Sequence, residues 1–188
     1  NGNWHKYSPV NGYADVRKAI ANKFERDNGL SFTPDQIVIS TGAKQALINV
    51  IMSLVGPGDE VVIPAPFWVS YASQVQLAGG IPVIVRSTLE EDWKVPVERI
   101  AAAITPKTRL LMFSSPCNPS GSVLTRAEHE ALAEEVAKHK DLYVIADEIY
   151  EHIVFDGAHF SFASLPGMAE RTITVNGLSK AFALTGWR

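Results

Sequence analysis

The sequence predicts an α/β fold of three layers, in which a mostly parallel β-sheet lies between two layers of helices. Short runs of β-branched and other apolar residues alternate with longer segments of helical periodicity along most of the 188 residues. This alternation is typical of a parallel sheet covered by helices on both faces. The composition is 46% hydrophobic and 20% charged, which is ordinary for a globular domain with a buried core. We therefore expect one α/β domain.

The predicted strands are short apolar runs, several of them bounded by turn-forming residues. They are Ile37–Ser40, Glu60–Ile63, Pro82–Arg86, Arg109–Ser114, Leu142–Ala146 and Thr172–Val175.

Helices are predicted between most of these strands. The clearest begins at Ala43, because its apolar residues recur at helical spacing until the Gly56-Pro57-Gly58 breaker. Another begins after Thr125, which with Glu128 has the spacing of a capping box. The predicted helices are Tyr13–Asn28, Ala43–Val55, Trp68–Ala78, Pro96–Ile104 and Arg126–Lys138.

Composition also limits the classes of partner. Lysine and arginine (17) against aspartate and glutamate (20) give a net charge of -3 without a basic block, so we expect no nucleic-acid partner. The lone Cys117 cannot form an internal disulfide, and no apolar run is long enough for a membrane span. We expect a reducing, cytoplasmic compartment. The histidines do not form a ligand spacing with a cysteine, so we expect no metal site.

Four candidate functional positions each follow a predicted strand within a few residues. They are Gly42, Asn118, Asp147 and Lys180. Because ligands of open parallel sheets gather beyond the carboxyl ends of the strands, these positions are expected to share one site.

The motifs around these positions carry a family resemblance. NGLSKAFALTGWR ends the chain, DEIY begins at Asp147, PCNPSG begins at Pro116 and STGAKQAL begins at Ser40. Together they resemble the pyridoxal 5'-phosphate (PLP) aminotransferases of the aspartate aminotransferase family, class I. The resemblance implies the large domain of the type-I PLP-dependent transferase fold. It also implies that Lys180 forms a Schiff base with PLP and shuttles the catalytic proton, although a lysine taken alone is usually a solvated surface residue.

The resemblance assigns contacts to the PLP ring. PLP is an electron sink only if its ring nitrogen stays protonated, which requires a carboxylate in a poorly solvated place. Asp147 is assigned that position, and Tyr150 is expected to hydrogen-bond the ring 3-oxygen; the alternative for Asp147 is a helix or turn cap. Glu148 is expected to point away, because side chains alternate along an extended chain.

Asn118 resembles the asparagine of the family's N-P-x-G motif, whose amide also reaches the 3-oxygen. The alternative is a plain turn, since its neighbours are turn-forming residues. The family pattern implies a cis bond before Pro119. Trp68 resembles the aromatic that stacks on the PLP ring, although buried aromatics are usually core residues. Trp68 and Asn118 are also expected to contact substrate.

Phosphate binding is predicted at the start of the helix that follows Gly42. Gly42, Ala43 and Lys44 lie where unpaired amides and the helix dipole favour an anion. The alternatives are a glycine required only by a tight turn and a solvated Lys44. By resemblance Arg188 binds the same phosphate through its planar donor fork.

Two further features concern the phosphate and the assembly. The family often has serine where this chain has Gly177, so one phosphate hydroxyl is expected to be missing while Ser179 is kept. By the resemblance, Tyr7 is expected to reach the phosphate bound by a second subunit, which implies a homodimer; the alternative is an ordinary half-buried tyrosine. Phe67 and Tyr71 are interpreted as packing residues.

The predicted function is amino-group transfer by a ping-pong mechanism, with aspartate or a similar acidic amino acid and 2-oxoglutarate as substrates. The alternatives are another class I specificity (aromatic, alanine or prephenate), a PLP lyase, a non-catalytic PLP-binding effector domain of a transcription regulator, or a structural remnant. Residues 1–188 are expected to be an incomplete PLP-binding large domain of a longer enzyme, without the N-terminal arm and the C-terminal small domain. The family's arginine for the substrate α-carboxylate belongs to that small domain.

Overall fold

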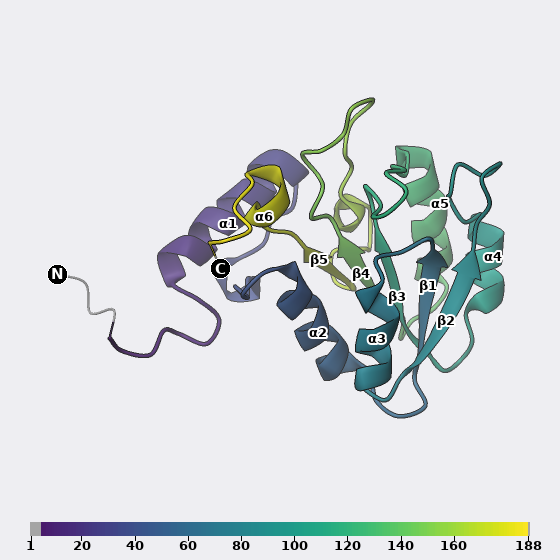
Figure 1. The fold of residues 1–188 in the computed structure, drawn as a ribbon, viewed down its shortest axis with the longest axis horizontal. Helices are drawn as coiled ribbons and strands as arrows, with labels where there is room; N and C mark the ends of the chain where they lie inside the picture. Colours follow the sequence, from purple (N-terminus) through teal and green to yellow (C-terminus); the bar gives the residue numbers. More distant parts are fainter. Residues whose placement is uncertain (1–4, 188) are drawn as a thin grey trace.

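The computed structural model describes residues 5–187, which form a parallel sheet between helical layers (Figure 1). Within these residues the sheet has five strands in the order β2-β1-β3-β4-β5, and every neighbouring pair is parallel. The strands are β1 (Glu60–Ala65), β2 (Ile81–Arg86), β3 (Thr108–Ser114), β4 (Tyr143–Asp147) and β5 (Thr172–Val175). The α/β fold class predicted from the sequence is confirmed.

The helices are those expected between the strands, together with three short elements. They are α1 (Ala14–Asn28), η1 (Pro34–Gln36), α2 (Ala43–Leu54), α3 (Ser70–Leu77), α4 (Val97–Ala103), α5 (Arg126–Ala137), η2 (Phe162–Ser164) and α6 (Leu178–Ala181). The capping box at the start of α5 is confirmed: Thr125 Oγ1 accepts from the Glu128 amide at 3.2 Å, and the Glu128 carboxylate accepts from the Thr125 amide at 2.6 Å.

Side chains on the strands alternate between two hydrophobic clusters. On β1, Val61 and Ile63 pack with α2 and α3, whereas Val62 packs with α4 and α5 on the other face. The same alternation on β4 sends Ile145 toward α2 and α3 and Ala146 toward α5. The two helical layers are visible on either side of the sheet (Figure 1). This alternation fixes the layer that each polar residue at the end of β4 faces.

The chain reverses its direction across the sheet between β1 and β3. After β1 it forms β2 on one side, then returns past β1 to form β3, β4 and β5 on the other side. The carboxyl ends of β1 and β3 therefore flank a topological switch point, which is where open α/β sheets form ligand crevices. The segments leaving these two strands contain Trp68 and Asn118.

One predicted strand, Ile37–Ser40, is wrong. The segment is irregular and lies outside the sheet. Ile37 is buried in a separate cluster with Phe24 of α1 and Leu30, and the Ile39 amide donates to the Asn11 carbonyl at 3.2 Å. Its apolar residues are thus buried against α1 and its neighbouring loops, which an apolar run alone does not distinguish from a strand.

The described residues contain no helix that is both long and apolar enough to cross a membrane.

Candidate active site

Asp147 is the last residue of β4 and is buried, with 4% of its surface exposed. It lies on the face of the sheet that α2 and α3 cover, as the alternation from Ile145 requires. Its Oδ2 accepts a hydrogen bond of 2.6 Å from the Tyr71 hydroxyl of α3, and its Oδ1 accepts one of 3.3 Å from the Ile149 amide. A carboxylate is therefore held at the carboxyl edge of the sheet by donors that carry no positive charge.

Burial changes the acidity of this carboxyl. Loss of water raises the pKa of Asp147 to about 6, although the bonds from Tyr71 and from the Ile149 amide act in the opposite direction. The Glu148 carboxylate, next along the chain, also raises the pKa of Asp147. A cationic partner at this place would favour the charged form and bring the pKa down again.

An aromatic cluster surrounds Tyr71 beside this carboxylate. The rings of Trp68 and Tyr71 pack edge to face, with centroids 5.8 Å apart, and those of Phe67 and Tyr71 are stacked at 6.3 Å. The ring of Tyr71 is fully buried and its hydroxyl bonds Asp147. The interpretation of Tyr71 as a packing residue was therefore incomplete.

Asn118 and Tyr150 lie together. Asn118 follows β3, Tyr150 follows β4, and the Asn118 Nδ2 atom donates to the Tyr150 hydroxyl at 3.3 Å. Both residues are half-buried. An amide and a phenol side by side form a pair of donors suited to an oxyanion.

The loop that carries Asn118 is fixed to the end of β1. Cys117 Sγ donates to the Pro66 carbonyl at 3.3 Å, so the segments leaving β3 and β1 are joined across the switch point. The Cys117 carbonyl also accepts from the Gly121 amide at 2.8 Å, which closes a tight turn. The bond between Asn118 and Pro119 is cis, as the resemblance implies.

Gly42, Ala43 and Lys44 lie at the start of α2. Gly42 precedes the helix with a φ of 91°, a conformation that favours glycine, and Ala43 is the first helical residue. The Lys44 Nζ atom lies 4.9 Å from the centre of the Trp68 ring, which is a cation–π contact between α2 and the segment after β1.

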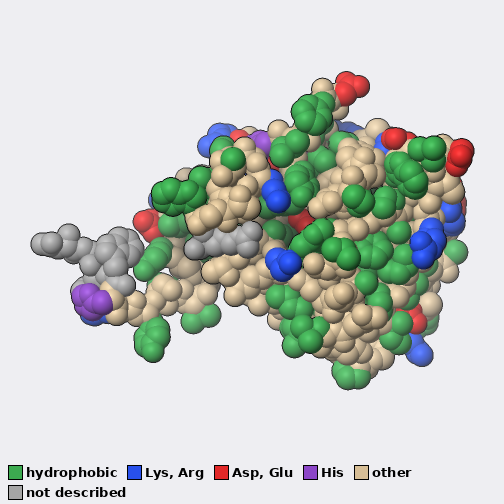
Figure 2. Space-filling model, viewed as in Figure 1, with side chains coloured by type: hydrophobic (Ala, Val, Ile, Leu, Met, Phe, Trp, Pro, Cys, Tyr) green, Lys and Arg blue, Asp and Glu red, His purple; other side chains and the backbone are tan. Residues whose placement is uncertain are grey.

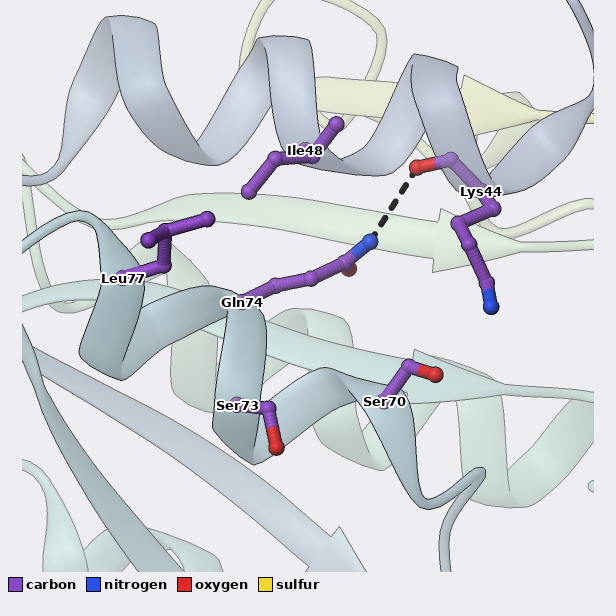
Figure 3. A pocket seen from close by; sticks show the side chains of 6 residues that line it. All are labelled: Lys44, Ile48, Ser70, Ser73, Gln74 and Leu77. Carbon is purple, nitrogen blue, oxygen red and sulfur yellow. Dashed lines mark hydrogen bonds between the residues drawn. The ribbon is translucent and has the colours of Figure 1, made fainter.

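A groove of about 320 Å³ runs between α2 and α3 beside Lys44 (Figure 3). The Gln74 side chain donates to the Lys44 carbonyl at 3.1 Å and so ties the two helices together. Lys44 and Ser70 lie at one end of the groove and Ile48 and Leu77 at the other (Figure 3). Figure 2 shows basic side chains close to a recessed acidic side chain near the middle of this face, with hydrophobic side chains around them.

Lys180 belongs to α6, the short helix after β5, and its side chain is exposed. The loop that leads to it passes close to the residues after Asp147, because a Cβ atom added at Gly177 would lie 3.0 Å from Ile149 Cδ1. The element that carries Lys180 thus adjoins the β4 end. Among the described residues no ion pair to Lys180 is present.

One predicted residue lies apart from this arrangement, and another cannot be placed relative to it. The Tyr7 side chain is fully exposed in the segment before α1. Arg188 lies outside the described residues.

Glu148 was assigned no role from the sequence, yet it holds the loop after β4 in place. The side chain points away from the Asp147 side, as expected, and is 2% exposed. Its carboxylate accepts from the Ser161 hydroxyl at 3.0 Å and from the Phe162 amide at 3.0 Å, and it contacts His159 Nε2 at 3.2 Å. The signal for this role was a second acidic residue directly after a buried strand, where alternation places it in the opposite layer.

Residues at the carboxyl edge fit the predicted PLP group by the chemistry of their donors and acceptors. Asp147 is a buried acceptor with neutral partners, so a cationic ring nitrogen would complete it. Asn118 and Tyr150 offer adjacent donors, and the start of α2 offers unpaired amides for an anion.

Comparisons with known proteins show what the chain is similar to. The family described as "Aminotransferase class I and II" matches residues 1–188. A bifunctional aspartate aminotransferase and glutamate/aspartate-prephenate aminotransferase of Petunia hybrida is 52% identical over 184 residues, which are 97% of this chain and 38% of that protein. An aspartate/prephenate aminotransferase of Cereibacter sphaeroides is 48% identical over 185 residues, 97% of this chain and 46% of that protein.

Solved structures show the same similarity in three dimensions. An aspartate aminotransferase from Thermus thermophilus with maleate superposes with a TM-score of 0.94 at 46% identity, over 97% of this chain and 47% of that chain. An aromatic aminotransferase from Pyrococcus horikoshii gives a TM-score of 0.94 at 47% identity, over 97% and 49% of the two chains. The chain thus spans about half, or less, of the length of these proteins.

Proposed function

The chain belongs to the class I and II aminotransferase family, and from this premise we propose that the whole protein is a PLP-dependent transaminase. The observation that carries the proposal is the buried Asp147 carboxylate, held by neutral donors at the carboxyl edge of the sheet. Asn118 and Tyr150 extend from the two neighbouring strand ends to the same edge.

The proposed work of Asp147 is electrostatic. PLP, when bound, supplies an electron sink for the electrons released at the substrate α-carbon. Asp147 keeps the ring nitrogen protonated, because a buried carboxylate with only neutral partners gains most from a nearby positive charge. Asn118 and Tyr150 stabilise negative charge on the ring oxygen by donating to it. Trp68 covers the ring and excludes water.

Lys180 is the proposed covalent anchor and proton carrier. Its amine would hold PLP at the carbonyl carbon of the cofactor, and once free it would carry a proton at the substrate α-carbon. The loop at Gly177 lies close to Ile149, which supports a location of Lys180 near Asp147.

The cofactor phosphate is proposed to bind at the start of α2. Gly42 forms the turn before the helix, and its own amide donates to the Ser40 carbonyl at 2.7 Å. Ala43 offers a backbone amide, and Lys44 and Arg188 offer positive charge. Two observations support this proposal. Gly42 has a positive φ at the turn into α2, and Lys44 lies against Trp68, which puts a cation beside the proposed ring site.

The proposed substrates are an acidic amino acid, aspartate first, and a 2-oxo acid such as 2-oxoglutarate. This choice is supported by relatives named aspartate or aspartate/prephenate aminotransferase, at 52% and 48% identity for the two described above. Prephenate and aromatic substrates are the second candidates, because the same names include prephenate and a similar structure is an aromatic aminotransferase. The aminotransferase names favour neither a lyase nor a transcription regulator.

The proposed assembly is a homodimer in which Tyr7 contacts the phosphate bound by the partner subunit. The full exposure of Tyr7 supports a contact outside its own chain. We also propose that residues 1–188 form the large domain, and that the arm and the small domain belong to the rest of the whole protein. The share of its relatives that the chain covers supports this division. A cytoplasmic location is proposed from the single cysteine.

The test is an absorbance spectrum of the whole protein with PLP. We expect a band of lysine-bound cofactor that changes on addition of aspartate and returns on addition of 2-oxoglutarate. Lys180→Ala removes the band, whereas the matched variant Lys140→Ala, distant along the chain and exposed, keeps it. A spectrum of Lys180→Ala identical to that of the parent refutes the assignment. Prephenate and aromatic amino acids in the same assay decide between the two substrate classes.

A further inference from the structure

Tyr71 contacts both Asp147 and Trp68, the acidic and the aromatic residue of the proposed cofactor site. It lies in the first turn of α3, its side chain is fully buried, and its hydroxyl is 2.6 Å from Asp147 Oδ2. The same ring packs edge to face against Trp68. No other side chain of the described residues donates a hydrogen bond to Asp147; its second bond comes from the backbone of Ile149.

The Tyr71–Asp147 bond has the properties of a charge-assisted contact. A distance of 2.6 Å is short for a hydroxyl donor and is typical of an O–H group that bonds an ionised carboxylate. Tyr71 remains the donor because burial and the neighbouring Asp147 charge raise the pKa of its phenol. The hydroxyl therefore cannot compete for the negative charge that Asp147 carries.

The two bonds to Asp147 also define the orientation of its carboxylate. Tyr71 engages Oδ2 at 2.6 Å, while Oδ1 has only the longer 3.3 Å contact with the Ile149 amide. Because a side chain carboxylate rotates readily unless its oxygens are held, the donor on Oδ2 restricts this rotation.

We propose that Tyr71 is a positioning residue of the cofactor site, whose hydroxyl keeps the Asp147 carboxylate ionised and correctly oriented for a cationic ring nitrogen. The proposal rests on the proposed function, because it assumes the role given there to Asp147. Tyr71 does not itself touch the reacting atoms. The Tyr71 ring also packs against Trp68. One residue of α3 therefore positions both the Asp147 carboxylate and the Trp68 ring proposed to stack on the cofactor.

Few groups shift the pKa of Asp147, so the contribution of the Tyr71 hydroxyl can be measured separately from the others. Burial and the Glu148 charge raise the pKa of Asp147, and the Tyr71 hydroxyl and Ile149 amide lower it. Removal of the hydroxyl leaves burial and Glu148 unchanged. The carboxyl is then protonated at a higher pH and is a weaker partner for a cation.

The experiment compares Tyr71→Phe with Tyr143→Phe in the whole protein. Tyr143 is a half-buried tyrosine of the same hydrophobic cluster, and its ring is covered by Arg109 at 5.2 Å. Tyr143→Phe therefore removes a phenol hydroxyl near the same core without a contact to Asp147. The two measurements are the dissociation constant of PLP and, in the cofactor-free protein, the titration of the Asp147 carboxyl by carbon NMR, assigned with Asp147→Asn.

The expected result is that Tyr71→Phe weakens PLP binding about tenfold, as expected for the loss of a charge-assisted hydrogen bond, and moves the Asp147 titration to higher pH. Tyr143→Phe changes neither. If Tyr71→Phe matches Tyr143→Phe in both measurements, the proposal is wrong. A second substitution, a ring-fluorinated tyrosine at position 71, keeps the size and strengthens the donor. This substitution is expected to lower the pH at which the Asp147 carboxyl titrates. A shift of that titration to higher pH contradicts the proposal.

Failure of the proposed function gives a different pattern. If the parent protein does not bind PLP, the proposed function fails, and the NMR titration of the cofactor-free protein still decides whether Tyr71 keeps Asp147 ionised. If the parent binds PLP and Tyr71→Phe binds it equally well with an unchanged titration, only the proposal on Tyr71 is overturned.

Discussion

Asp147 and Glu148 are adjacent and both are buried, yet they face opposite layers of the fold. Asp147 faces α3 and has one hydroxyl and one amide as donors. Glu148 faces the η2 side, where it meets the Ser161 hydroxyl, the Phe162 amide and His159. Strand alternation therefore separates a carboxylate held by one hydroxyl and one amide from a carboxylate that also contacts an imidazole.

The difference lies in what remains available to a ligand. Glu148 has three protein donors, and one of them is an imidazole that can carry a positive charge. Asp147 has only neutral donors, and burial raises its pKa to about 6. We infer that Asp147 contributes to binding and catalysis, whereas Glu148 contributes to the stability of the loop between β4 and η2.

The largest expected effect is on activity at Asp147. Asp147→Asn keeps the size of the side chain and an acceptor for Tyr71 but removes the charge. We expect kcat/KM to fall by about 10²–10³-fold, the usual cost of removing one preorganised electrostatic group. At about pH 4, where the parent carboxyl is mostly protonated, the free energy of unfolding is expected to change by less than about 1 kcal/mol, because the hydrogen bond remains. Steady-state kinetics and urea unfolding measure the two quantities. A nearly unchanged kcat/KM contradicts the role in catalysis that distinguishes Asp147 from Glu148.

The next effect is on the pH dependence of stability. The folded-state pKa of Asp147 is raised from 3.8 to about 6, so the folded protein binds a proton more tightly than the unfolded chain does. The stability that this group contributes is therefore present below about pH 4 and is lost as the pH rises through 6. In the cofactor-free protein, the difference in unfolding free energy between the parent and Asp147→Asn is expected to fall by about 2 kcal/mol from roughly pH 4 to pH 7. A difference that does not vary with pH is the contrary outcome.

A third prediction concerns Glu148. Glu148→Ala leaves the Ser161 hydroxyl and the Phe162 amide without their acceptor in a buried place. We expect the free energy of unfolding to fall by about 2 kcal/mol. The kcat/KM of the folded protein is expected to stay within about threefold of the parent, since Glu148 faces away from the site. Urea unfolding and active-site titration separate the two effects, and a loss of kcat/KM as large as that of Asp147→Asn would remove the distinction between the two carboxylates.

The sequence predicted much of this arrangement because its signals are local. Alternation along β4 was sufficient to send Glu148 away from Asp147, and the capping box at Thr125 marked the start of α5. The roles of Lys180, Asn118 and Tyr150 in binding PLP remain predictions, although the structure places Asn118 and Tyr150 in contact.

Other features depend on contacts between distant parts of the chain. The bond from Tyr71 to Asp147 joins residues 76 positions apart, and no local pattern encodes it. Ile37–Ser40 has the composition of a strand but is buried against α1, so its neighbours decide its structure. The helix α6 has only four residues, which is too short for a periodic signal.

The most direct test of the account is to locate the covalent bond between protein and cofactor. The whole protein is incubated with PLP, reduced with borohydride, digested and analysed by mass spectrometry. We expect the added cofactor mass on the peptide that contains Lys180. We also expect Asp147→Asn to weaken cofactor binding without moving the attachment. Attachment at another lysine, such as Lys44, or no attachment in the correctly folded protein, would contradict it.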